Sequence, residues 1–227
     1  MLANFLIPIH RDGWRFIAIG AALTLLLAWT FLFWPLLLLT LWCVYFFRDP
    51  PRLVPQRAGL FVAPADGLVQ SVRYAVPPPE LGLGFQPLTR VSIFLSVFDV
   101  HINRIPCDGM VEVVAHHPGK FISAGSDKSS DENERQAVLL RLDDGRKVAL
   151  VQIAGLVARR IVCELRPNRR VRAGERYGLI RFGSRTDVYL PDGVQPLVAP
   201  GQRMIGGETV IADLDGVESS ARPAAEV

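Results

Sequence analysis

The chain has 227 residues, of which half are hydrophobic, and a formal net charge of +3. This length allows one domain with a sizeable core and a further short segment. Residues 1–57 hold five arginines and two aspartates and so carry the whole net charge, which leaves no basic footprint for a nucleic acid in the rest of the chain. The three cysteines, Cys43, Cys107 and Cys163, are too widely spaced for a disulfide framework or a zinc motif, so we expect a reducing compartment and no metal site.

The N-terminal segment is strongly apolar, with no charged residue between positions 16 and 47. This stretch is longer than the roughly 20 residues of one membrane crossing and short for two. Pro35 and several tryptophans interrupt it, and these residues favour a helix break and a membrane interface. We predict a helical membrane anchor over residues 1–57, broken near Trp34–Pro35. It forms either a re-entrant hairpin or one crossing followed by an interfacial helix.

The arginines on both flanks of the apolar segment predict where the protein is located. Positively charged residues near membrane segments favour the cytoplasmic side, and they attract anionic lipids there. We therefore expect both ends of the anchor at the cytoplasmic face of the inner membrane.

From residue 58 onward the sequence indicates β structure. Short runs of β-branched, aliphatic and aromatic residues are separated by Gly, Pro or Asp every eight to twelve residues. We predict a mainly β fold, a compact all-β barrel or sandwich over residues 58–217, with a flexible tail over 218–227. The clearest strands are 91–95, 138–142 and 148–153, with a hairpin turn at 143–145 and loops at 76–84 and 125–135.

Two pairs of segments repeat within this domain. Residues 64–72 are similar to 106–114, and residues 173–180 are similar to 206–212. Repeated turn-and-strand units predict an internal pseudo-symmetry. The second pair also resembles the hairpins of lipoyl-type carrier domains, although neither copy has the lysine that such carriers modify.

A Gly183–Ser184 pair lies between two predicted strands, where a bulge or bend is the ordinary interpretation. Two earlier motifs change that interpretation: an acidic turn, Pro64-Ala65-Asp66-Gly67, and a strand end, Asp99-Val100-His101. In this order the three motifs resemble those of the phosphatidylserine decarboxylase proenzymes, in particular the short bacterial and archaeal type. The resemblance runs from about residue 48 to residue 214.

The resemblance implies a self-cleaving, pyruvoyl-dependent lyase. Asp66 would orient His101, which would deprotonate Ser184 so that its oxygen attacks the carbonyl of Gly183. Ser184 would then become a covalent pyruvoyl group, and the chain would separate into two fragments that stay together as a heterodimer. The resemblance also implies a lipid substrate at the membrane surface, phosphatidylserine, which loses its carboxylate to give phosphatidylethanolamine. It leaves the number of copies in an assembly open.

The sequence departs from the longer members of the family at one position. Those members have a second histidine three residues after the first, and here that residue is Arg104. Either His101 serves both self-cleavage and decarboxylation, or His117 supplies a second imidazole. Asp99 and Asp108 are the alternatives to Asp66 as the residue that orients the base.

Two other functions fit parts of the sequence. One is a membrane-anchored Ser-His-Asp esterase, against which there is no Gly-x-Ser-x-Gly elbow. The other is a non-enzymatic carrier-like β module. The arginines upstream of the Gly-Ser pair form either ordinary solvated surface or a binding face for anionic lipid head groups. They are Arg159, Arg160, Arg166, Arg169, Arg170 and Arg172.

Overall fold

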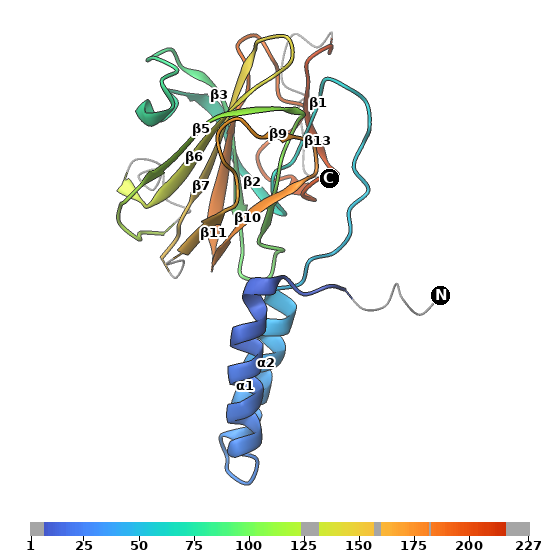
Figure 1. The fold of residues 1–227 in the computed structure, drawn as a ribbon, viewed down its shortest axis with the longest axis vertical. Helices are drawn as coiled ribbons and strands as arrows, with labels where there is room; N and C mark the ends of the chain where they lie inside the picture. Colours follow the sequence, from blue (N-terminus) through green and yellow to red (C-terminus); the bar gives the residue numbers. More distant parts are fainter. Residues whose placement is uncertain (1–6, 124–131, 157–159, 182, 217–227) are drawn as a thin grey trace. The chain divides into compact units, whose positions relative to one another are not determined.

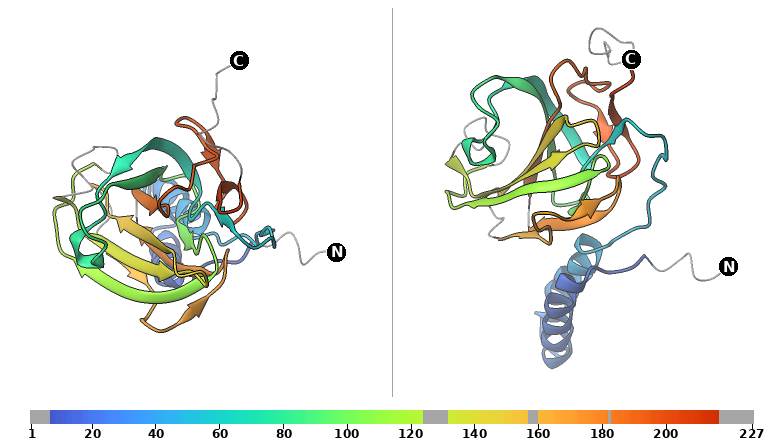
Figure 2. Two further views of the ribbon diagram at one scale, coloured as in Figure 1. Left: turned by 90° about the horizontal axis from the view of Figure 1, so that it is seen from above. Right: turned by 45° about the horizontal axis from the view of Figure 1, so that its top comes forward.

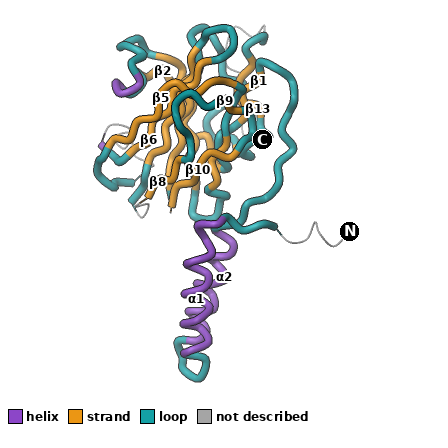
Figure 3. The backbone as a smooth tube through the Cα atoms, in the orientation of Figure 1, coloured by secondary structure: helices purple, strands orange, loops and turns teal. Residues whose placement is uncertain are grey.

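A computed structural model describes residues 7–123, 132–156, 160–181 and 183–216. The chain divides into two compact units, Met1–Pro51 with Val97–Val100, and Arg52–Ser96 with His101–Val227. The first unit is built on two helices, and the second is built on strands (Figures 1 and 3). The mainly β class predicted from the sequence is confirmed.

The helical unit consists of two short helices joined by a turn. Helix α1 covers Trp14–Leu26 and helix α2 covers Phe33–Phe46. The break lies at residues 27–32, slightly ahead of the predicted one, because Pro35 falls in the first turn of α2. A proline is tolerated there, since its missing N–H has no intrahelical partner to lose.

Small residues bring the two helices close together. A Cβ atom on Gly20 would lie 2.6 Å from the hydroxyl of Thr40, so only glycine allows this approach. The hydroxyls of Thr24 and Thr40 are 3.4 Å apart across the contact. The outward-facing side chains are large and apolar, and Trp29 is completely exposed. Within the described ranges, the helices are too short to count as membrane spans.

The β unit contains one large antiparallel sheet and two small ones. The large sheet has the strand order β12-β2-β3-β11-β7-β6-β5-β9, and the small sheets have the orders β4-β10-β8 and β1-β13. The strands are β1 Leu60–Val62, β2 Gly67–Ala75, β3 Leu88–Leu95, β4 Ile102–Arg104, β5 Gly109–His117, β6 Arg135–Arg141, β7 Lys147–Ile153, β8 Arg160–Cys163, β9 Arg170–Val171, β10 Arg176–Arg181, β11 Ser184–Tyr189, β12 Arg203–Met204 and β13 Val210–Asp213. The large sheet curls strongly (Figure 2), and in the described part of the chain it stays open, with β12 and β9 at its edges.

The strands and the hairpin turn predicted from local patterns are confirmed. β3, β6 and β7 coincide with the three predicted runs, and the turn at 143–145 joins β6 to β7. The predicted loop at 76–84 contains one short 3-10 turn, Pro79–Leu81. Of the predicted loop at 125–135, residues 125–131 lie outside the described ranges, and Arg135 already begins β6.

Both faces of the large sheet are buried along its central strands. One face, called here the first face, packs against the two small sheets, and its core includes Ile93, Leu150 and Val188 together with Phe61 and Tyr177 from the small sheets. The other face, the second face, has its own apolar cluster, which Leu81 of the 3-10 turn covers. Because successive strand residues alternate between faces, Ser184 and Thr186 share the first face with Val188.

The internal repeat is visible in the structure. β2 and β5 are each nine residues long, each begins at a glycine, and each has a bulge at the equivalent place, beside Gln70 and Glu112. The turns before them are also alike. Asp66 accepts a hydrogen bond from the Gly206 amide at 2.8 Å, and Asp108 accepts one from the Ala173 amide at 2.7 Å. The repeat therefore extends to the contacts that close each turn.

Candidate active site

The Gly183–Ser184 pair lies at a corner where the chain changes sheets. β10 pairs with β4 and β8 in the small sheet, whereas β11 pairs with β3 and β7 in the large one. Only residues 182 and 183 connect the two strands, and Phe182 lies outside the described ranges. Gly183 has φ +68°, in the left-handed region that glycine adopts most readily. The corner therefore requires glycine at the position whose carbonyl would be attacked.

Ser184 is the first residue of β11 and is completely buried. Among the described residues, its Oγ atom has no hydrogen-bond partner. Leaving a buried polar group unpaired costs about 1–3 kcal/mol, so such atoms are rare and need an explanation. A hydroxyl kept free for nucleophilic attack is one such explanation.

His101 is the titratable side chain that the structure brings to this pair. It directly precedes β4, and the pairing of β4 with β10 places it beside the corner that follows β10. Its Nε2 atom accepts a hydrogen bond from the amide of Gly183 at 3.2 Å, and the side chain is 1% exposed. An Nε2 that accepts a hydrogen bond belongs to an imidazole with its proton on Nδ1, which is the form able to take up a proton at Nε2.

Asp66 has a different environment. Nη2 of Arg52 donates to both oxygens of its carboxylate, at 2.9 and 2.7 Å, and the Gly206 amide donates as well. No contact with His101 is among those described for Asp66. The turn instead meets β4 through the backbone, because the carbonyl of Pro64 accepts from the amide of Arg104 at 2.7 Å. The structure thus brings His101 to the cleavage pair and leaves Asp66 in the turn that supports the end of β4.

The remaining candidates are one histidine and two aspartates. His117 ends β5 and is exposed, and Arg135 is its partner across the ladder. Asp99 belongs to the segment assigned to the helical unit and is buried. Asp108 holds the repeat's equivalent turn through the Ala173 amide.

Sequence reasoning missed a buried polar group next to the pair. Asn103 lies two residues after His101, and its Nδ2 contacts Oγ1 of Thr186 at 3.4 Å. Nε2 of Gln152 donates to Oδ1 of Asn103 at 2.7 Å and to the Val162 carbonyl at 3.3 Å. The only local signal was a glutamine inside an otherwise apolar strand. The role of this glutamine depends on which strands lie opposite it, and a local pattern does not show that.

A second buried polar group lies on the opposite face of β11. Arg185, the residue after Ser184, donates to both oxygens of Asp187 at 2.9 and 3.0 Å, and Arg90 of β3 lies 3.7 Å from the same carboxylate. All three side chains are at most 5% exposed. A buried charge is retained at acceptable cost only when it is paired in this way, so this group holds β11 to β3 in one register.

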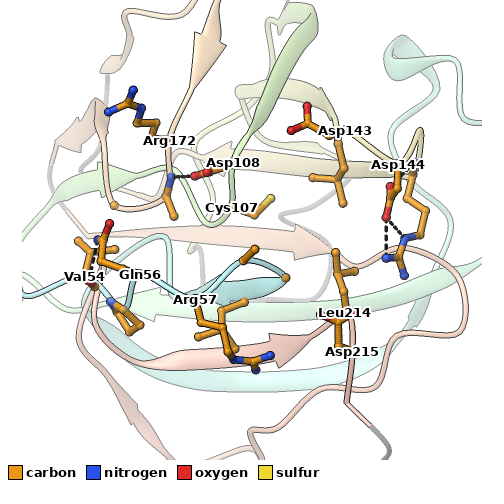
Figure 4. Close-up of a pocket in the computed structure, with 18 of the residues that line it drawn as sticks. Val54, Gln56, Arg57, Cys107, Asp108, Asp143, Asp144, Arg172, Leu214 and Asp215 are labelled. Atoms are coloured by element: carbon orange, nitrogen blue, oxygen red, sulfur yellow. Dashed lines mark hydrogen bonds and ion pairs between the residues drawn. The ribbon is translucent and has the colours of Figure 1, made fainter.

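A surface cavity of the β unit lies away from this pair. It has a volume of about 650 Å³ and lies between residues 54–60, the turns at 142–146 and 172–175, and residues 214–215 (Figure 4). Neither His101 nor Gly183 nor Ser184 lines it. Several of its charged side chains are already paired, such as Arg146 with Asp144. We therefore place the chemistry at the corner, on geometry, and assign no ligand to the cavity.

The arginines upstream of the corner are partly paired. Arg169 forms an ion pair with Glu175, and Arg170 contacts Asp143 with two hydrogen bonds, at 2.9 and 2.7 Å. The hydrogen bond from Arg170 lowers the pKa of Asp143. Arg159 lies outside the described ranges. Since two members of the cluster hold carboxylates on the surface, their role at a lipid surface stays a prediction.

Comparisons with known proteins agree with the motifs. The family model described as phosphatidylserine decarboxylase matches residues 39–212. Three relatives carry the name phosphatidylserine decarboxylase proenzyme. They are 57% identical over 227 residues in Cereibacter sphaeroides (99% of this chain and 98% of the relative), 56% over 215 residues in Paramagnetospirillum magneticum (94% and 90%) and 55% over 216 residues in Ruegeria pomeroyi (94% and 99%).

The position of the two histidines predicts different effects of their removal. His101→Ala should leave the chain uncut, because no other described imidazole contacts the Gly183–Ser184 corner. His117→Ala, at an exposed strand end, should cut as the wild type does. A time course on denaturing gels measures both. Efficient cutting of His101→Ala together with loss of cutting in His117→Ala would move the base to His117.

Proposed function

Because the chain belongs to the phosphatidylserine decarboxylase family, we propose that it is a proenzyme that cuts itself between Gly183 and Ser184 and then converts phosphatidylserine to phosphatidylethanolamine. The observation that carries the proposal is the contact between Nε2 of His101 and the Gly183 amide, beside a buried Ser184 hydroxyl with no partner. A candidate nucleophile and a candidate base therefore lie beside a glycine in the left-handed conformation.

Self-cleavage uses only groups of this chain. His101 takes the proton of the Ser184 hydroxyl, and the oxygen attacks the carbonyl carbon of Gly183. The peptide bond breaks, the former amide nitrogen takes up a proton, and an ester joins the two residues. Elimination then removes the α-proton of residue 184 and releases Gly183 as a carboxylate. The dehydroalanine that remains tautomerises to an imine, and one water molecule hydrolyses it to a pyruvoyl group with loss of ammonia. The free Ser184 Oγ and the φ of Gly183 fit a group made at this place.

The pyruvoyl group supplies a carbonyl that condenses with an amine and accepts electrons as carbon dioxide leaves. The chain supplies a buried imidazole, His101, which can hold or return a proton at this position. Arg104, which replaces the second histidine of longer members, donates to the Gly174 carbonyl at 2.9 Å and lies at the Asp66 turn. These contacts favour a structural role for Arg104 and one imidazole, His101, for both reactions.

The sheet pairing supports a stable heterodimer after the cut. Residues 184–227 contain β11, β12 and β13, and the longer fragment contains all their partners. β11 lies between β3 and β7, β12 pairs with β2, and β13 pairs with β1. Separating the fragments would expose the buried Arg185–Asp187–Arg90 group and break the centre of the large sheet. The two fragments therefore stay together without a covalent link.

The helical hairpin is proposed to be the membrane anchor, at the cytoplasmic face of the inner membrane. Helices of 13 and 14 residues are about 20 Å long, which is shorter than the hydrocarbon core of about 30 Å. Large exposed apolar patches on a protein commonly mark an interaction surface. The completely exposed Trp29 and the +3 charge of residues 1–57 support a hairpin that enters one leaflet of an anionic membrane.

Self-cleavage predicts two fragments in the purified protein. The smaller one holds residues 184–227, about one fifth of the 25.1 kDa chain, and should run near 5 kDa on a denaturing gel. Its N-terminus should resist Edman degradation, and its intact mass should show the loss of the serine amine. Ser184→Ala should fold but remain one chain. An intact wild-type chain that still decarboxylates the lipid would exclude this mechanism.

Asp66 and Asp108 form a matched pair for testing the acidic turn. Asp66→Ala should slow self-cleavage much more than Asp108→Ala, because the Asp66 turn binds the backbone of β4 directly, through the Pro64 carbonyl and the Arg104 amide, whereas Asp108 binds the Ala173 amide. Rates of cutting after synthesis in a cell-free system measure the difference. Asp66→Asn, which can still accept from the Gly206 amide, separates the two roles of Asp66. Asp66→Asn should still cut itself if Asp66 acts by holding the turn, and should not cut itself if the carboxylate charge must orient His101.

Deleting the helical segment tests the anchor. A chain that begins at Arg52 lacks both helices and their exposed apolar surface, so binding to anionic vesicles in a sedimentation assay should fall sharply. Activity on bilayers should fall much more than activity on short-chain dispersed phosphatidylserine. Equal losses on the two substrates would assign the helices to the catalytic fold instead.

A further inference from the structure

Two buried polar atoms have no hydrogen-bond partner among the described residues, and the residues that carry them lie diagonally across one strand pair. One is Oγ of Ser184 and the other is Oε1 of Gln152, and both residues are completely buried. Gln152 is the cross-strand partner of Thr186, which lies two residues after Ser184 on the same face of the sheet. Diagonal neighbours across a strand pair are about 7–8 Å apart between Cα atoms. The free oxygen of Gln152 therefore belongs to the surroundings of Ser184.

The orientation of the Gln152 amide is fixed by its neighbours. Its Nε2 donates to Oδ1 of Asn103 and to the Val162 carbonyl, so both N–H groups are used. Asn103 in turn contacts Thr186 with its own Nδ2. This network decides which end of the amide is nitrogen and leaves the oxygen as a pure acceptor.

An unpaired acceptor in this position needs an explanation. A buried acceptor without a donor costs stability, and a methionine of similar volume would avoid the cost. The chain keeps an acceptor beside the residue at which a substrate amine must react. An ammonium group provides N–H donors that such an acceptor would bind.

We propose that the side-chain oxygen of Gln152, held in place by Asn103, binds the amino group of the lipid substrate beside residue 184. This inference rests on the proposed function, because it requires an amine-bearing substrate at that residue. Gln152 is a binding residue here and takes no part in self-cleavage. Since Gln152 is buried in the intact chain, the surroundings of Ser184 open to the lipid once the corner is cut.

Two lipids that cannot react with a carbonyl test this contact. Phosphatidyl-N,N-dimethylethanolamine, when protonated, is a cation with one N–H donor, whereas phosphatidylcholine is a cation with none. The nitrogen of the dimethyl lipid is tertiary and that of phosphatidylcholine is quaternary, so neither lipid condenses with a carbonyl as a primary amine does. Their inhibition constants against the cleaved wild-type enzyme, measured in mixed micelles, should differ by about tenfold or more in favour of the dimethyl lipid.

The variants then assign the difference to Gln152. In Gln152→Met the ratio of the two inhibition constants should fall to near one, and KM for phosphatidylserine should rise, while self-cleavage continues. Gln152→Glu keeps an oxygen at this place and should retain or increase the ratio. Gln136→Met is the matched control. Gln136 of β6 lies directly opposite Gln152, on the same face of the sheet and one strand farther from Ser184. It should leave the ratio unchanged.

The outcomes separate this inference from the proposed function. Equal inhibition of the wild type by both lipids, or an unchanged ratio in Gln152→Met, would overturn the inference and leave the oxygen to a trapped water. Neither result affects self-cleavage or decarboxylation by the wild type. A wild-type chain that neither cuts itself nor decarboxylates the lipid would instead overturn the proposed function. If Gln152→Met neither folds nor cuts itself, the ratio of the two inhibition constants in the wild type and in Gln152→Glu still tests the inference.

Discussion

The site depends on one constraint, which is that the chain must change sheets within two residues. β10 is held by β4 and β8, and β11 is held by β3 and β7, so neither strand can move to relax the connection. Gly183 accepts the left-handed backbone that this corner requires. The same strand pairing sets His101 against the Gly183 amide. The bond proposed to be cut and the proposed base beside it are therefore placed by the same strand arrangement.

Local sequence patterns predicted the strands, and the family resemblance identified the cleavage pair, but neither predicted the contacts between distant segments. Alternation and turn residues were sufficient for β3, β6, β7 and the turn between the last two. His101 was identified through the family resemblance, because a histidine at a strand end is by itself more often structural. Gln152 looked like an ordinary strand residue, because its role depends on Asn103, forty-nine positions away. The ion pair of Asp66 with Arg52 could not be predicted for the same reason, since no repeating pattern of neighbouring residues indicates it.

The internal repeat shows how one turn serves two purposes. Asp66 and Asp108 close equivalent turns with equivalent backbone contacts, so the turn itself is architecture. The copies differ in what surrounds them. The Asp66 carboxylate also binds Arg52, and its turn supports β4, whereas Asp108 lines the open cavity of about 650 Å³. An acidic turn of this kind therefore does not by itself identify a catalytic carboxylate, and its neighbours decide what it does.

Placing the reactive residue at the start of a central strand also explains how a cut protein can keep a precise site. After cleavage, position 184 is a chain end, and a chain end in a loop would be free to move. Here the next residues remain paired on both sides, Arg185 with Phe94 and with Ile153. The guanidinium of Arg185 is further held by Asp187 in a buried pair. This pair opposes a shift of the strand register, because a shift by one residue would turn both charges toward the apolar first face. The cut thus breaks the covalent bond at the corner, while strand pairing holds the new chain end in place. Rigid mounting of this kind is what a group that must meet a substrate amine in one orientation requires.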